Sequence, residues 1–233
     1  PEAGLPLEIL HDGEDAPARL LPFVEKEKPL GIDKDWPARF LIRLMELHAA
    51  PEYRNASDAC DDARAVKDAA EQEAMRVSSK VNDDCMAEFE ALIRPGITEK
   101  EMADAIRGIY AAHGCSDVSF APICGFGPHA ADPHHDNDDT PLTAGQCVLI
   151  DVGGVYHDYC SDMTRTFFTA EPTEEERRVY ELVRQAQAAA EALVKPGVRL
   201  CDIDAAARDV ITAGGYGPYF YHRLGHFIGL QDH

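Results

Sequence analysis

The chain contains an internal repeat, and this repeat limits the folds it can adopt. Residues 91–114 (ALIRPGITEKEMADAIRGIYAAHG) align without gaps with residues 192–215 (ALVKPGVRLCDIDAAARDVITAGG), 101 positions further on. Each copy has the pattern of a helix end, a Pro-Gly turn, an amphipathic helix and a glycine stop. Two copies are too few for a solenoid. The repeat therefore predicts a domain with two-fold pseudosymmetry, in which each half places helices outside and strands inside.

Capping signals mark where the helices around the repeat begin. Thr98 and Glu101 form a predicted capping box in the first copy, and Thr173 and Glu176 form another before a helix that runs to about residue 194. In the second copy, Asp202 is the expected N-cap.

Between these helices the sequence alternates between helical and strand-like patterns. No Gly or Pro interrupts residues 62–93, and apolar residues recur there at a spacing of three to four, which predicts one long helix. Residues 146–154 (QCVLIDVGG) and 163–168 (MTRTFF) are rich in strand-forming residues. The pattern indicates an α+β domain.

Residues 1–57 differ in character from the rest of the chain. They contain seven prolines, one helical stretch and few strand candidates, which is too little to bury a core of their own. We expect this segment to be the remnant of a preceding domain and its linker.

Composition excludes some classes of function. The formal net charge is −20, and such an acidic surface repels phosphate backbones, so no nucleic acid is expected as a partner. No apolar run approaches the roughly 18–20 residues of a membrane span, and no membrane partner is expected. The seven cysteines are scattered without a CxxC pair, which favours reduced thiols and a cytoplasmic location.

Two aspartates lie where a carboxylate is costly. Asp151 follows the apolar run VLI, and Asp162 begins the next predicted strand. A buried carboxylate needs a partner or a metal ion, and a hairpin would bring the two aspartates together. The alternative is that Asp151 is a turn residue at the end of its strand and that Asp162 is a cap or a partner of Arg165.

Three histidines lie in the last twelve residues, HRLGHFIGLQDH. They are His222, His226 and His233, and the glycines at 225 and 229 speak against a helix and for close backbone approach. Carboxylates combined with an imidazole suit a pair of transition-metal ions.

A further pair of histidines occurs in PHHD. Shifted by the repeat offset, His134 falls two positions from His233, so the two are expected to face each other across the pseudosymmetry axis. His135 is expected in a surface loop.

Four segments together resemble the prolidase and Xaa-Pro aminopeptidase family. They are GFGPHAADPHH, AGQCVLIDVGG, YCSDMTRTF and HRLGHFIGLQDH, and the resemblance extends from about residue 64 to residue 233. It implies the pita-bread fold shared with methionine aminopeptidase and creatinase. Residues 58–233 would then be the catalytic domain, incomplete at its C-terminus, and residues 1–57 the remnant of a creatinase-like N-terminal domain.

The resemblance also implies roles for individual residues. Asp151 would bind one metal ion, Asp162 would bridge two, and His226 would complete the ligands present. His134, His222 and His233 would act on the substrate, with Thr164 and Arg165 supporting the Asp162 strand. The implied cofactors are two divalent ions (Mn, Co or Zn), which would lower the pKa of a bridging water.

The sequence departs from the family after His233. Family members continue there with an acidic residue and two glutamates that serve as metal ligands. Without them, this chain is expected to bind metal weakly and to be inactive or weakly active. Gln231 and Asp232 also depart from the family pattern, and neither is expected to touch a ligand.

The resemblance favours a metallopeptidase that cleaves peptide bonds next to proline, either a dipeptidase or an aminopeptidase. Its partners would be a proline-containing peptide substrate and a second copy in a homodimer. One alternative is a non-catalytic pita-bread binding module. The other is a creatinase-like hydrolase that works without metal.

Overall fold

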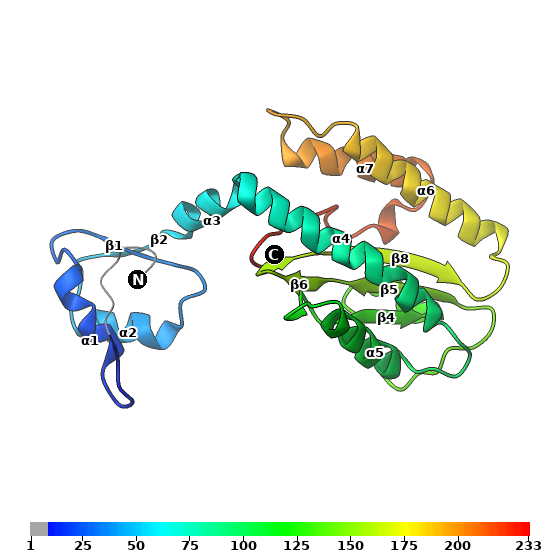
Figure 1. Cartoon of the computed structure of the whole chain (residues 1–233). Coiled ribbons are helices and arrows are strands. Elements are labelled where there is room, and N and C mark those ends of the chain that lie inside the picture. Colours follow the sequence, from blue (N-terminus) through cyan, green and yellow to red (C-terminus); the bar gives the residue numbers. More distant parts are fainter. Residues whose placement is uncertain (1–8) are drawn as a thin grey trace. The chain divides into compact units, whose positions relative to one another are not determined.

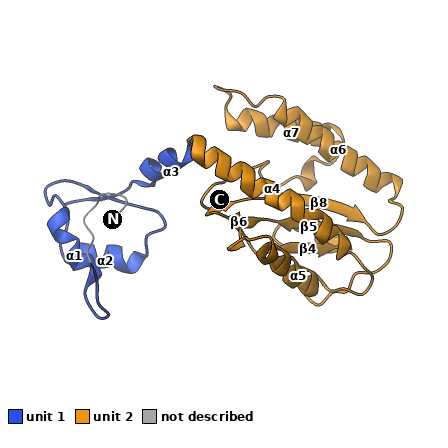
Figure 2. Cartoon of the chain, in the orientation of Figure 1, with its two compact units in different colours: residues 1–66 blue, residues 67–233 orange. Residues whose placement is uncertain are grey.

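A computed structural model describes residues 9–233 of the chain (Figure 1). Contacts divide the chain into two compact units, residues 1–66 and 67–233 (Figure 2). Residues 1–8, which belong to the segment expected as a domain remnant, lie outside the described residues. The contact-based boundary falls after Val66. The division into domains after residue 57 stays a prediction. The assignment of the first unit to a larger N-terminal domain stays a prediction.

The first unit contains two short strands that the sequence did not indicate. They pair in parallel, with Leu30 opposite Tyr53. The Tyr53 hydroxyl donates to the carbonyl of the buried Leu44 at 2.9 Å and so connects strand to helix. The elements are α1 (Ala16–Arg19), a 3₁₀ turn (Leu21–Phe23), β1 (Leu30–Ile32), α2 (Ala38–Glu46), β2 (Tyr53–Asn55) and α3 (Ser57–Ala65).

The single helix predicted over residues 62–93 is wrong, because the chain breaks after α3. Val66 is extended, and α4 (Ala69–Ala91) begins anew. The Asp68 carboxylate accepts hydrogen bonds from the N–H groups of Ala70 and Glu71, and the Glu71 carboxylate accepts one from the N–H of Asp68. This capping box satisfies donors at the new helix start and therefore favours an interruption that apolar periodicity did not indicate.

The repeat is visible in the helices of the second unit. α5 (Glu99–Ala112) and α7 (Leu200–Ala213) begin and end 101 residues apart. α5 packs with α4 on one core, and α7 packs with α6 (Glu174–Glu191) on another. The two repeated amphipathic helices predicted from the sequence are confirmed.

Two of the three predicted caps are confirmed. Thr98 and Thr173 each form a capping box with the glutamate three residues later. Asp202 is not an N-cap. α7 starts after Arg199, and the Asp202 carboxylate accepts two hydrogen bonds from the Arg199 guanidinium instead.

Two small antiparallel sheets lie beside α4 and α5 (Figure 1). One has the order β4–β5–β8, and its central strand pairs Asp151 with Thr164 on one side and with Ile123 on the other. The other has the order β3–β6–β7. The bounds are β3 (Asp117–Val118), β4 (Ile123–Phe126), β5 (Cys147–Val152), β6 (Gly154–Tyr156), β7 (Tyr159–Cys160) and β8 (Met163–Phe168), with 3₁₀ turns at Gly127–Ala131 and Gly217–Tyr219.

The seven cysteines differ in burial, and Cys60 and Cys201 are exposed. Cys85 and Cys124 are fully buried, and burial raises the pKa of each thiol to about 12. All seven cysteines are free, as predicted. Among the described helices, none is both long and apolar enough to cross a bilayer.

Candidate metal centre and active site

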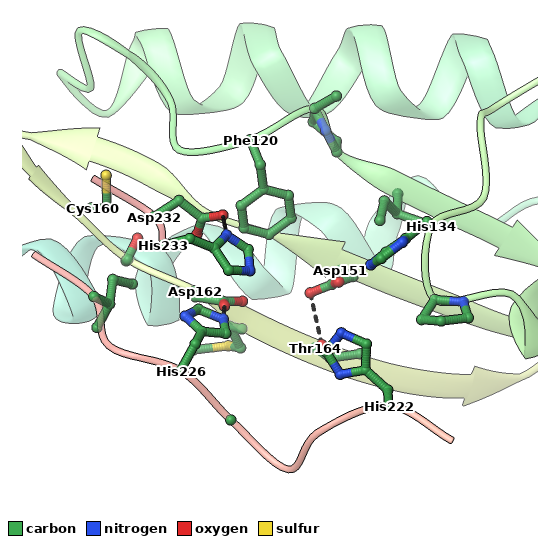
Figure 3. A pocket seen from close by; sticks show the side chains of 18 of the residues that line it. Phe120, His134, Asp151, Cys160, Asp162, Thr164, His222, His226, Asp232 and His233 are labelled. Atoms are coloured by element: carbon green, nitrogen blue, oxygen red, sulfur yellow. Dashed lines mark hydrogen bonds and ion pairs between the residues drawn. The ribbon is translucent and has the colours of Figure 1, made fainter. Parts of the chain in front are cut away.

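One pocket of about 810 Å³ lies over the ends of β5 and β8 in the second unit. Its walls come from the strand ends, residues 120–123, residues 133–137 and the last twelve residues, with further side chains from α4 and α6 (Figure 3). All six residues selected from the sequence line it, namely His134, Asp151, Asp162, His222, His226 and His233.

The strand register brings the two aspartates to the same pocket. Asp151 is the penultimate residue of β5, and Asp162 immediately precedes β8, which pairs with it. The chain between them is drawn in tightly at Gly153. A Cβ atom built there would lie 1.9 Å from the carbonyl oxygen of Ser161, so only glycine fits.

His226, which was expected to share a metal site with Asp162, lies in contact with that residue. Its Nε2 lies 3.2 Å from Oδ2 of Asp162, and its ring stacks on His233 with centroids 4.1 Å apart. Its Nδ1 lies 2.8 Å from the carbonyl oxygen of Phe227, which can only accept, so Nδ1 carries a proton. A neutral His226 then presents the lone pair of Nε2 to the Asp162 carboxylate. Such a pair is stable only with a proton or a cation between the two atoms.

The carboxylates of the pocket repel one another. Burial raises the pKa of Asp151, and the neighbouring charges of Asp162 and Asp232 raise it further. Burial and the Asp232 charge likewise raise the pKa of Asp162. This is the electrostatic signature of a site that gains stability from a bound cation.

Asp232 is a further acidic residue that lines the pocket together with the two aspartates. That it touches no metal ligand stays a prediction. Its Oδ2 contacts Nδ1 of His233 at 2.7 Å, while its buried Oδ1 has no hydrogen-bond partner within the described chain. An orphaned carboxylate oxygen in a pocket with two other carboxylates fits a divalent cation.

The residues expected to support Asp162 make other contacts. The Thr164 hydroxyl donates to Oδ1 of Asp151 at 2.7 Å (Figure 3). The Arg165 guanidinium donates to the carbonyl of Thr164, and the ion pair of Asp162 is with His226. The interpretation of Asp162 as a partner of Arg165 is therefore not supported.

His134 projects into the pocket from the loop above β5, close to His222 (Figure 3). The two rings are perpendicular, with centroids 5.6 Å apart. The repeat offset suggested His233 as the facing residue. The final segment instead crosses the pocket so that His222 meets His134 and His233 meets His226.

A second cluster was not predicted from the sequence. Glu99, His129 and His135 bring three potential ligand atoms within 4.8 Å of one another, which could hold a metal ion. His135 was expected in a surface loop, but its side chain is only 12% exposed. The hydrogen bond that His129 donates to the Glu99 carboxylate raises the pKa of His129. Glu99 lies within a helix-start sequence, TEKE, where local signals indicate capping, so no sequence pattern pointed to this cluster.

A pseudosymmetric α+β domain with carboxylates and imidazoles gathered in one pocket at its central strand ends defines a pita-bread hydrolase of the metal-binding type. The model of metallopeptidase family M24 matches residues 73–233. The chain belongs to this family, whose members depend on divalent metal ions.

Individual relatives agree with this classification. A Staphylococcus epidermidis protein named as an uncharacterized peptidase is 38% identical over 181 residues, covering 78% of this chain and 52% of the relative. A dipeptidase from Pyrococcus horikoshii has a TM-score of 0.91 and 32% identity, covering 99% of this chain and 65% of that structure. A prolidase from Pyrococcus furiosus has a TM-score of 0.87 and 29% identity, covering 96% and 65%. The chain thus spans about half the length of the staphylococcal relative.

Proposed function

We propose that this protein hydrolyses peptide bonds next to proline with the help of divalent metal ions, as an Xaa-Pro dipeptidase or aminopeptidase. The observation that carries the proposal is the convergence of Asp151, Asp162 and His226 on one pocket in a chain of family M24. The likeness to a structure described as a prolidase supports the preference for proline.

Asp151, Asp162 and His226 are the residues that would hold the metal, with two ions (Mn, Co or Zn) expected in the complete protein. When bound, such ions supply a Lewis acid and lower the pKa of an attacking water. The unpartnered Oδ1 of Asp232 adds negative charge to the same pocket and supports its affinity for cations.

The chain's own groups would orient these ligands. The carbonyl of Phe227 holds the proton of His226 on Nδ1 and leaves the lone pair of Nε2 for a metal ion that Asp162 would share. The Thr164 hydroxyl occupies one oxygen of Asp151 and restricts the rotation of that carboxylate. Partners of this kind contribute to metal affinity by fixing ligand geometry.

The histidines on the opposite wall would act on the substrate. His222 resembles His226 in that its Nδ1 donates to a backbone carbonyl, here that of Arg223 at 2.7 Å. Its Nε2 is then free to accept a proton from the substrate. We assign His134 to stabilisation of the oxygen of the reacting carbonyl, and His222 and His233 to substrate contact or proton transfer.

Pocket walls near the histidines are suited to a proline ring. Phe120, Ile123 and Ile228 contribute apolar surface to the same pocket. Apolar walls with a few polar groups are typical of sites that orient small substrates. The homodimer and the cytoplasmic location stay predictions.

The test is cleavage of an Xaa-Pro dipeptide by the complete protein and its Asp162→Ala variant. We expect the variant to lose metal-dependent cleavage. The matched control is Asp158→Gly, which removes the same charge from an exposed turn where φ is +69° and glycine is at ease. Cleavage that persists with a chelator would contradict the metal mechanism and favour the creatinase-like alternative. No hydrolysis of any Xaa-Pro substrate would favour the binding module.

A further inference from the structure

Glu99 is a fully buried carboxylate that accepts four hydrogen bonds. Oε1 accepts from the N–H of Phe126 at 3.0 Å and from Nδ1 of His129 at 2.9 Å. Oε2 accepts from Nε2 of His135 at 2.6 Å and from the N–H of Asp138 at 3.2 Å. All four donors lie in one stretch of chain that starts at the end of β4.

These bonds close a loop at both of its ends. Phe126 ends β4 and Asp138 lies twelve residues later, and the two backbone donors bring both positions to one carboxylate. The two imidazoles fix the intervening chain from inside. Buried charge is costly without such compensation, and hydrogen bonds to a charged acceptor are stronger than neutral ones. Glu99 is also the first residue of α5, where the helix dipole favours a carboxylate.

His134 belongs to this loop and lines the pocket. It is adjacent to His135, whose ring is held by Glu99, and its own side chain is exposed on the pocket wall. Its backbone N–H donates to the Asp132 carboxylate within the same loop at 2.9 Å. The placement of the His134 ring therefore depends on how firmly the loop is held.

We propose that Glu99 is a positioning residue for His134, acting through His135 and the closed loop. The proposal rests on the proposed function, because it assumes that His134 acts on the substrate. Glu99 itself is not among the described residues that line the pocket, so it would act on the substrate only through other residues.

The same cluster could be considered as a metal site, because its ligand atoms are close together. Both carboxylate oxygens already accept one backbone N–H and one imidazole. A metal ion would have to displace the imidazole protons from both oxygens. The four hydrogen bonds to Glu99 form without displacing any proton, and they are therefore the favoured arrangement. Metal binding by Glu99 is one of the outcomes that the experiment distinguishes.

The experiment is a double-mutant cycle in the complete protein with an Xaa-Pro dipeptide as substrate. We expect Glu99→Gln to lower kcat by about 10- to 100-fold with a smaller change in KM, because a displaced catalytic group loses alignment. We expect His134→Ala to cost at least as much. The double variant should be no slower than His134→Ala alone, since Glu99 would act only through His134.

Glu101→Gln is the matched control. It removes the same charge two residues later in α5, where the Glu101 side chain accepts from the N–H of Thr98 and so belongs to the helix cap rather than to the loop. We expect its kcat and KM to stay unchanged. Amide hydrogen exchange across residues 127–138 should accelerate in Glu99→Gln and not in Glu101→Gln.

Additive losses in the cycle would overturn the proposal, as would a Glu99→Gln enzyme with unchanged kcat. Loss of one equivalent of bound zinc in Glu99→Gln would make Glu99 a ligand instead. If Glu99→Gln does not fold, His135→Asn tests the same link while leaving the buried carboxylate with its two backbone donors. If the wild type cleaves Xaa-Pro substrates and the His134→Ala variant cleaves them equally well, the role of Glu99 is rejected but the proposed function is not. A wild type without hydrolysis would reject the proposed function.

Discussion

At the scale of single residues, Gly153 at the base of the metal pocket has no space for a side chain. Gly153 approaches the Ser161 carbonyl so closely that any side chain would collide with backbone rather than with a movable side-chain end. Ser161 is buried, and its hydroxyl exchanges hydrogen bonds with Gly154 at 3.1 Å. Since Asp162 follows directly, displacement of this turn would move a predicted metal ligand.

Gly153→Ala should therefore destabilise the protein by about 1–3 kcal/mol, the usual cost of overpacking, and weaken metal binding. Chemical denaturation and metal titration measure the two effects. Gly108→Ala is the control, because Gly108 is exposed within α5 with no atom within 4 Å of the added Cβ. That change should stabilise the protein by about 0.5–1 kcal/mol through helix propensity. Equal stability of Gly153→Ala and the parent chain would contradict the steric argument.

At the scale of whole elements, α5 and α7 are the equivalent helices of the two repeats. Each of them holds the histidine-containing segment that follows it in the chain. α5 does so with the Glu99 acceptor, whereas the aligned residue of α7, Leu200, is 65% exposed. α7 uses Arg208, whose guanidinium donates to the carbonyls of Phe220 and His222. Both halves therefore hold a histidine-containing segment against a helix. The first half uses a carboxylate acceptor and the second uses a guanidinium donor.

The anchor on α7 includes a carboxylate with a shifted pKa. Asp204 pairs with Arg208 and accepts from the N–H of Leu224 at 2.8 Å, and these interactions lower its pKa from 3.8. A lowered folded pKa contributes stability above the unfolded value, and this contribution is lost as the pH falls through the folded value. We expect Asp204→Asn to cost about 1 kcal/mol at pH 7 and little below pH ~3.

Urea unfolding at both pH values tests this difference. Asp209→Asn, an exposed position on the same helix, should change stability equally little at both. A cost of Asp204→Asn that is the same at pH 7 and in acid would show that the anchor does not act through the carboxylate charge.

At the scale of the whole molecule, the chain carries a net charge of −20 and gathers four aspartates in one pocket. Cation binding to the folded state alone must stabilise it by mass action. The ligands in the described residues are few for two ions, so the affinity of this chain should be weak.

We expect Mn²⁺ to raise the unfolding temperature of this 233-residue chain only when the ion is in large excess. At about 100 times the dissociation constant the gain would be about 2.7 kcal/mol. Chelator should reverse the shift, and an Asp151→Asn/Asp162→Asn variant should not show it. Two tight sites in a titration of this chain would contradict the prediction of weak binding.

Much of the fold could be predicted because its signals are local. The repeat placed α5 and α7 with the correct offset, and two Thr-x-x-Glu sequences marked helix starts. The exceptions also have local causes, since Asp68 starts a new helix where periodicity suggested continuity. Short strands such as β1 and β2 depend on pairing with each other and carried little signal of their own.

The sequence by itself determined the pseudosymmetric α+β domain and six of the residues that line its pocket. These rest on spacing, capping and strand patterns that act over a few residues. Only the tertiary structure decided which of these groups meet: His134 with His222, Thr164 with Asp151, Asp232 with the aspartates, and Glu99 with two histidines. The physical reason is that the energy of a buried charge depends on its neighbours in space, and those neighbours come from distant parts of the chain.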